Sequence, residues 1–143
     1  GEAERFCTVM VARVRPNGKR VDVTVSCGGH PPPLVLRPGR AVMAADCEGT
    51  LLGIFSDPQL VDRSVELEPG DSVVLYTDGA VERFERAGRG GDAHLVSLLW
   101  ESEDDDAAGI ADRIYRDAAM TEAQANRDDL AVIVLRVRPD GSS

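Results

Sequence analysis

The chain has 143 residues and a formal net charge of −9 at pH 7. This length fits a single domain with a buried apolar core, and the acidic balance excludes a nucleic-acid-binding surface, because phosphates would be repelled. The longest apolar runs are strand-sized and fall well short of the ~20 residues that a membrane helix requires. We therefore expect a soluble protein that does not contact membranes, and the cysteine content, described next, favours the cytoplasm.

The three cysteines are odd in number and include no CxxC pair; they are Cys7, Cys27 and Cys47. The sequence therefore predicts neither a disulfide framework nor a zinc knuckle, and a reducing compartment is favoured. The chain begins with glycine rather than methionine, and no signal-peptide pattern follows. We expect that a segment upstream of residue 1 has been removed.

The first half of the chain predicts antiparallel β-sheet. Residues 6–14 are rich in β-branched side chains, residues 21–25 alternate between apolar and polar, and Pro16-Asn17-Gly18 between them is a turn signal. These segments predict a hairpin. Further strands are predicted at residues 34–36, 41–43, 61–67 and 72–76, the last with the continuous apolarity of a central strand.

After residue 79 the apolar spacing changes to that of helices. Residues 93–101 and 107–119 each carry an apolar face, and residues 130–137 predict a last strand. The order predicts an α+β fold in which residues 1–138 form one unit and residues 139–143 a disordered tail.

Two carboxylates are predicted at the ends of apolar strands. Asp78 follows residues 72–76, and Asp128 precedes residues 130–137. Acidic side chains on rigid strand ends suit Mg²⁺ or Mn²⁺, which prefer oxygen ligands. An isolated Asp-Gly pair is more often a turn, so this prediction depends on the surrounding sequence.

The surrounding elements form an ordered set. In sequence they are Phe6-Cys7-Thr8, Gly28-Gly29-His30-Pro31-Pro32, Leu52-Gly53, Glu68-Pro69-Gly70-Asp71, Leu75-Tyr76-Thr77-Asp78-Gly79 with Glu82, and Asp128-Asp129. This succession resembles the PPM (PP2C-like) metal-dependent serine/threonine phosphatases of the bacterial SpoIIE/RsbU type, over residues 5–137.

The resemblance implies an antiparallel β-sandwich flanked by helices, in α/β/β/α layers, with two Mn²⁺ or Mg²⁺ ions at one end. It assigns Asp78, with Gly79, and Asp128 to the metal site. Family members also carry a bridging Asp in a Gly-Asp-Val-x-Gly-His-Gly-like motif nearer the N-terminus, and this motif is absent here.

Asp78 and Asp128 alone would bind two ions weakly, because several carboxylates must share a site with four positive charges. We therefore expect the chain to be the C-terminal larger part of a phosphatase domain whose N-terminal strands are missing. Part of its core and a sheet edge should be uncovered unless another chain or a homodimer contact covers them. This fragment is expected to be inactive or poorly active alone.

Three further residues are candidates for supporting roles. Asp129 adjoins the metal site, and Arg127 could contact phosphate oxygens, although an exposed Arg that balances two aspartates is the more ordinary interpretation. His30 could be catalytic, but its place beside three prolines favours a hydrogen bond within its loop. His94 is expected to face solvent.

The implied activity is hydrolysis of phosphoserine or phosphothreonine by metal-activated water, without a covalent phosphoenzyme. The implied substrate is a regulatory protein of the anti-sigma-factor antagonist type, and a sensor domain often precedes such phosphatases. Two alternatives remain: a non-catalytic phosphatase-like module that binds a protein partner, and a β-rich interaction domain in which Asp78 and Asp128 are only turn residues.

Overall fold

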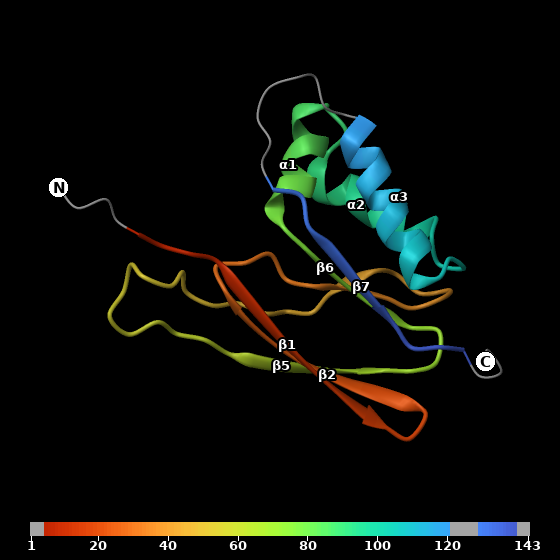
Figure 1. Ribbon diagram of the computed structural model, residues 1–143, viewed down its shortest axis with the longest axis horizontal. Coiled ribbons are helices and arrows are strands. Elements are labelled where there is room, and N and C mark those ends of the chain that lie inside the picture. Colours follow the sequence, from red (N-terminus) through yellow and green to blue (C-terminus); the bar gives the residue numbers. More distant parts are fainter. Residues whose placement is uncertain (1–4, 121–128, 140–143) are drawn as a thin grey trace.

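The computed structural model describes residues 5–120 and 129–139, and within them it contains two antiparallel sheets and three helices (Figure 1). One sheet has the order β1-β2-β5, from β1 (Val9–Asn17), β2 (Arg20–Gly28) and β5 (Asp62–Leu67). The other has the order β4-β3-β6-β7, from β4 (Met43–Ala44), β3 (Leu34–Leu36), β6 (Ser72–Tyr76) and β7 (Val132–Arg136).

The predicted first hairpin is present, with longer strands than expected. β1 pairs with β2 from Val9 opposite Gly28 to Asn17 opposite Arg20, so the turn lies at Gly18 and Lys19. Gly18 has a φ of +64°, which a glycine adopts without steric cost. Pro16 lies inside β1 rather than in the turn, and an edge strand tolerates it because an unpaired side has no need of its missing N–H.

The two sheets pack face to face around an apolar core. Alternate residues of β2 point inward because strand side chains alternate between the two faces. The buried members of this core are Val23, Val25, Cys27, Val35, Ala45, Cys47, Leu67 and Val73. The sandwich expected for this part of the chain is therefore confirmed.

The helices α1 (Asp78–Arg86), α2 (Gly91–Trp100) and α3 (Ala107–Met120) cover the outer face of the β4-β3-β6-β7 sheet (Figure 1). They form a second core with that sheet, whose buried members are Leu34, Leu36, Val74, Tyr76, Phe84, Leu95, Leu98, Leu99, Ile110, Ile114 and Ala118. β6 therefore contributes to both cores, as its continuous apolar run predicts.

Two details of the predicted architecture are wrong for the described residues. Two helices were expected after residue 79, but α1 is a third, which begins at Asp78 with no loop after β6. Helices were expected outside both sheets, but within residues 5–120 and 129–139 they cover only one. All three lie between β6 and β7, which are neighbours in one sheet, so the connection stays on that sheet's outer face.

The expectation of no disulfide is also wrong, because Cys27 and Cys47 are bonded to each other. Their Cα atoms lie 5.8 Å apart. The backbone N–H of Gly29 donates to the carbonyl oxygen of Gly49 at 2.9 Å, which holds the segment after β4 across the end of β2. Cys7 is a free, exposed thiol.

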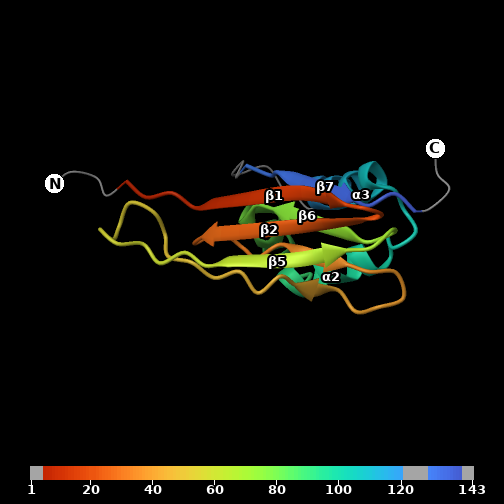
Figure 2. The ribbon, with the colours of Figure 1, turned by 90° about the horizontal axis from the view of Figure 1, so that it is seen from below.

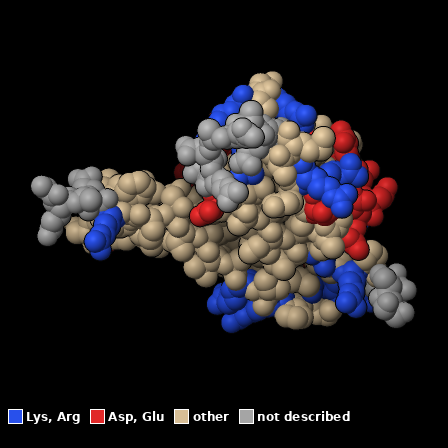
Figure 3. All heavy atoms as spheres, turned by 45° about the horizontal axis from the view of Figure 1, so that its top comes forward, with Lys and Arg blue, Asp and Glu red and all other residues tan. Residues whose placement is uncertain are grey.

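Apolar side chains are exposed on the edge strands and on an arm formed by residues 5–7 and 49–60. Val11 of β1 and Ile133 of β7 are 60% and 57% exposed, and Figure 2 shows these edge strands along the same side of the sandwich. The arm projects beyond the sheets with few charged side chains (Figure 3), and Phe6 and Phe55 on it are exposed. No helix within the described residues is long and apolar enough to cross a membrane.

Phe84 joins α1 to the helix–sheet core and is fully buried. We expect Phe84→Ala to lower the free energy of unfolding by about 3–5 kcal/mol, because the change leaves a cavity. Urea denaturation followed by circular dichroism measures this loss. Tyr115→Ala on the exposed face of α3 is the matched control, and a loss as large for that variant would contradict the assignment of the core.

The Cys27–Cys47 bond joins two cysteines at a sequence separation of 20. We expect Cys47→Ser to lower the free energy of unfolding by about 2–4 kcal/mol, since the bond restricts the unfolded chain. Denaturation with and without a reductant measures the effect. Cys7→Ser should change little, and insensitivity of the parent protein to the reductant would show that the bond does not form.

Candidate functional site

The end of β6 and the start of β7 are neighbours in the sheet. Tyr76 pairs with Val132, and the backbone N–H of Thr77 donates to the carbonyl oxygen of Ala131 at 3.1 Å. The hydroxyl of Thr77 donates to the carbonyl oxygen of Asp129 at 2.9 Å and accepts from the N–H of Ala131 at 3.0 Å. The backbones of the two strand ends therefore lie side by side, as the sequence predicts.

Asp78 and Gly79 are the first two residues of α1. Thr77 precedes them in extended conformation, with φ −85° and ψ 153°, so the chain turns from strand to helix at a single residue. The Asp78 carboxylate is exposed and lies in the first helical turn, where the helix dipole favours negative charge. Gly79 is buried.

The other predicted metal ligand, Asp128, lies outside the described residues, as does Arg127. Asp129 is described and exposed, and its carbonyl oxygen is held by the Thr77 hydroxyl. The structure therefore brings the backbone of Asp129 next to the residue that precedes Asp78. The metal-binding roles of Asp78, Gly79 and Asp128 stay predictions.

His30 lies at the same end of the sandwich. Its Nδ1 donates to the carbonyl oxygen of Pro31 at 3.0 Å, a hydrogen bond within its own loop. His30 also lines a pocket of about 270 Å³ together with Thr8, Thr77 and Ala131. This pocket opens beside the Thr77 hydrogen bonds, so His30 stays a candidate for a supporting role.

The described residues do not by themselves supply a set of metal ligands. Within residues 5–120 and 129–139, no three His, Cys, Asp or Glu side chains are grouped so that they could hold a metal ion. Asp78 offers one carboxylate there, whereas a two-ion site needs several. A complete site would require carboxylates from outside these residues.

Comparison with known protein families gives a match over nearly the whole chain. Residues 1–138 match the family described as stage II sporulation protein E (SpoIIE). The chain belongs to the SpoIIE family. This confirms the resemblance to PP2C-type phosphatase domains of the bacterial SpoIIE/RsbU branch, a family whose members use divalent metal ions.

Solved structures share the fold at low sequence identity. The SpoIIE phosphatase domain of Bacillus subtilis, presoaked with Mn, has a TM-score of 0.71 and 19% identity over 94% of this chain and 59% of its own. PppA of the Pseudomonas aeruginosa T6SS has a TM-score of 0.62 and 16% identity over 87% and 56%. The RsbU and RsbW domains of a Mycobacterium tuberculosis protein have a TM-score of 0.57 and 24% identity over 83% and 35%.

These likenesses carry the fold alone, and this SpoIIE-family chain spans less than two thirds of the length of each of those structures. A search of the curated proteins gives no match. The activity and partners of the whole protein are therefore matters for proposal and experiment.

Sequence reasoning missed a second pocket next to Asp78, on the helical side of the sheet. Tyr76 and Asp92 line it with Asp78. Burial and, second, the nearby Asp92 carboxylate raise the pKa of Tyr76 to about 12, so its hydroxyl stays protonated at neutral pH. The Tyr-Thr-Asp-Gly motif marks this neighbourhood, but only the packing of α2 brings Asp92 to it.

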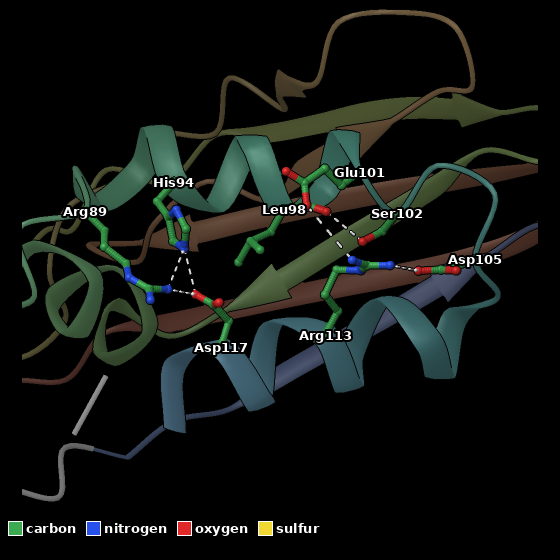
Figure 4. A network of polar contacts seen from close by, with 8 residues as sticks. All are labelled: Arg89, His94, Leu98, Glu101, Ser102, Asp105, Arg113 and Asp117. Carbon is green, nitrogen blue, oxygen red and sulfur yellow. Dashed lines mark hydrogen bonds and ion pairs between the residues drawn. The ribbon is translucent and has the colours of Figure 1, made fainter. Parts of the chain in front are cut away.

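Sequence reasoning also missed a polar cluster that joins α2, α3 and the segment between α1 and α2 (Figure 4). Asp117 of α3 accepts from His94 Nε2 at 2.6 Å and from Arg89 at 2.8 Å. The prediction that His94 faces solvent is wrong, since the ring is partly buried and packs edge-on against Phe84 with centroids 4.7 Å apart. The helix start that suggested exposure is covered by α3.

The electrostatics of Asp117 follow from these contacts. Partial burial acts to raise the pKa of Asp117, but the hydrogen bonds from His94 and Arg89 outweigh it and hold the pKa below its usual value. The pKa of Asp117 is therefore lower in the folded than in the unfolded protein. Such a carboxylate stabilises the fold at pH values above its unfolded-state pKa, and the stabilisation is lost as the pH falls through its folded-state pKa.

We expect Asp117→Asn to lower the free energy of unfolding at pH 7 by about 1 kcal/mol, a modest value because Arg89 is 41% exposed. The difference from the parent should shrink as the pH falls below about 4. Urea denaturation at a series of pH values measures it. Asp112→Asn, on an exposed part of α3, is the control, and a difference that grows toward acid would contradict the predicted sign.

Proposed function

We propose that this chain is the C-terminal larger part of a serine/threonine phosphatase domain. The reaction is hydrolysis of phosphoserine or phosphothreonine on a regulatory protein. Residues 1–138 constitute this part and residues 139–143 a tail. Membership of the SpoIIE family supports the reaction class.

The observation that carries the proposal is the Thr77 linkage between strand ends. Thr77 binds the backbone of Asp129 and Ala131 and directly precedes Asp78. A carboxylate at each of two adjoining strand ends is the arrangement that the family's metal site needs, and the linkage supports it because it holds those two ends together. Asp128 is the proposed second ligand.

Asp78 and Asp128, with carboxylates from outside the described residues, would hold two Mn²⁺ or Mg²⁺ ions, which would supply the activation of water for hydrolysis. The protein's own residues orient the site: Asp78 places a carboxylate at the start of α1, and the buried Gly79 follows it. We assign supporting roles to Asp129 and His30, and a phosphate contact to Arg127.

The proposed substrate is a phosphorylated protein of the anti-sigma-factor antagonist type, and an upstream sensor domain would control the enzyme. The likeness to RsbU and RsbW domains supports this class of partner. We propose a cytoplasmic location, where such regulators act. Disulfides are rare in that compartment, so the Cys27–Cys47 bond is a feature that argues against it.

A second candidate function is a non-catalytic module that binds a phosphoprotein without hydrolysing it. The lack of a three-ligand group among the described residues favours this alternative. The exposed apolar side chains of Val11 and Ile133 on the edge strands suit a covering segment or a second copy in a homodimer. The same features lead us to expect little activity from residues 1–143 alone.

The test is Mn²⁺-dependent hydrolysis of p-nitrophenyl phosphate by the full-length protein. We expect Asp78→Asn to reduce the rate by about a hundredfold or more, because the loss of a carboxylate weakens the hold on the ions. Removal of the metal by EDTA should abolish the activity. Asp112→Asn on α3 serves as the matched control and should retain the parent rate.

Equal rates for the parent protein and Asp78→Asn would remove Asp78 from the mechanism. If the full-length protein shows no metal-dependent hydrolysis but binds a phosphoprotein partner, the binding module is the correct function. Activity of residues 1–143 alone that equals the full-length rate would contradict the proposal that this part is incomplete.

A further inference from the structure

A pocket of about 360 Å³ lies on the helical side of the sheet, directly beside Asp78. Its apolar walls come from the loop after β2, from β3, and from α1 and α2. These wall residues are Pro31, Pro32, Leu34, Val81 and Val96. The volume falls in the range of about 300–1,000 Å³ typical of pockets that bind small groups, and it is ample for one long side chain.

Two polar side chains that line this pocket have no hydrogen-bonding or ion-pair partner among residues 5–120 and 129–139. Tyr76 is only 5% exposed, and within the described residues its hydroxyl makes no hydrogen bond. Asp92, in the first turn of α2, likewise forms no hydrogen bond or ion pair within the described part of the chain. The pocket therefore offers the hydroxyl of an otherwise buried tyrosine and an exposed carboxylate, and both are available to a group that enters it.

The charge of the lining selects the ligand. Its two charged groups are the carboxylates of Asp78 and Asp92, and no Lys, Arg or His is among the described residues that line it. Because Asp78 is also a proposed metal ligand, Asp92 is the charged group that remains to attract a cation and repel an anion in this pocket. Lys and Arg side chains combine an apolar stem with a cationic end, which matches apolar walls that lead to a carboxylate.

We propose that this pocket receives a Lys or Arg side chain of the phosphoprotein substrate, from a position close to its phosphorylated residue. The cationic end donates hydrogen bonds to the Asp92 carboxylate and to the Tyr76 hydroxyl oxygen, and the stem packs on Val81 and Val96. This inference rests on the proposed phosphatase function, because Asp78 belongs both to the proposed metal site and to the pocket lining. It assigns Asp92 a role in substrate specificity.

The test measures binding rather than turnover. Labelled peptides carry a non-hydrolysable phosphonate analogue of phosphoserine and differ only by arginine or citrulline at each flanking position, so that size is kept and charge is removed. Fluorescence anisotropy with the full-length protein should show about three- to tenfold tighter binding of an arginine peptide at one or more positions. Higher salt should reduce this preference.

The variant Asp92→Asn should remove the preference, and Tyr76→Phe should reduce it. Asp112→Asn, which lies outside the pocket, should leave it unchanged, and circular dichroism verifies that each variant is folded. If the parent shows no preference at any flanking position, or if Asp92→Asn keeps the full preference, the pocket does not select a cation and the inference is overturned.

Hydrolysis of p-nitrophenyl phosphate separates this inference from the proposed function. That substrate carries no cationic group, so its hydrolysis reports the phosphatase site without the pocket. If the protein hydrolyses p-nitrophenyl phosphate but binds arginine and citrulline peptides equally, the inference about the pocket is overturned and the phosphatase function stands. If the protein binds arginine peptides more tightly but does not hydrolyse p-nitrophenyl phosphate, the phosphatase function is overturned and the recognition of a cation by the pocket stands.

Discussion

The hydrogen bonds of Thr77 hold the end of β6 against the start of β7, and the candidate site depends on them. One hydroxyl donates to the carbonyl oxygen of Asp129 and accepts from the N–H of Ala131. Because β6 turns directly into α1 at this residue, the same bonds also set where Asp78 stands. A threonine is suited to the position, since its hydroxyl can donate and accept at once.

The packing explains why this strand end is rigid. β6 is covered on both faces: Val73 lies in the core between the sheets, while Val74 and Tyr76 lie in the core under the helices. Displacement of β6 would disturb both cores, which are close-packed and resist local change. A site on such a strand keeps its geometry better than one on a loop.

The helical side adds a second set of constraints around Asp78. The cluster of Asp117 with His94 and Arg89 ties α3 to α2 and to the segment before it. The packing of α2 places Asp92 in the same pocket as Tyr76. The pocket beside the candidate site is acidic like the chain as a whole, because both of its charged groups are carboxylates.

Local sequence patterns determined the strands, two of the three helices, the α+β class and the family, because alternation, turn residues and ordered motifs act over short distances. They misplaced the first turn and missed α1, where an Asp-Gly pair resembles a turn although Ala80 and Phe84 are buried at helical spacing. Only the tertiary structure decided the Cys27–Cys47 bond, the single helical layer of the described part, and the meeting of Tyr76 with Asp92. The physical reason is that these features join residues of different elements, and the packing of whole elements sets how closely those residues approach.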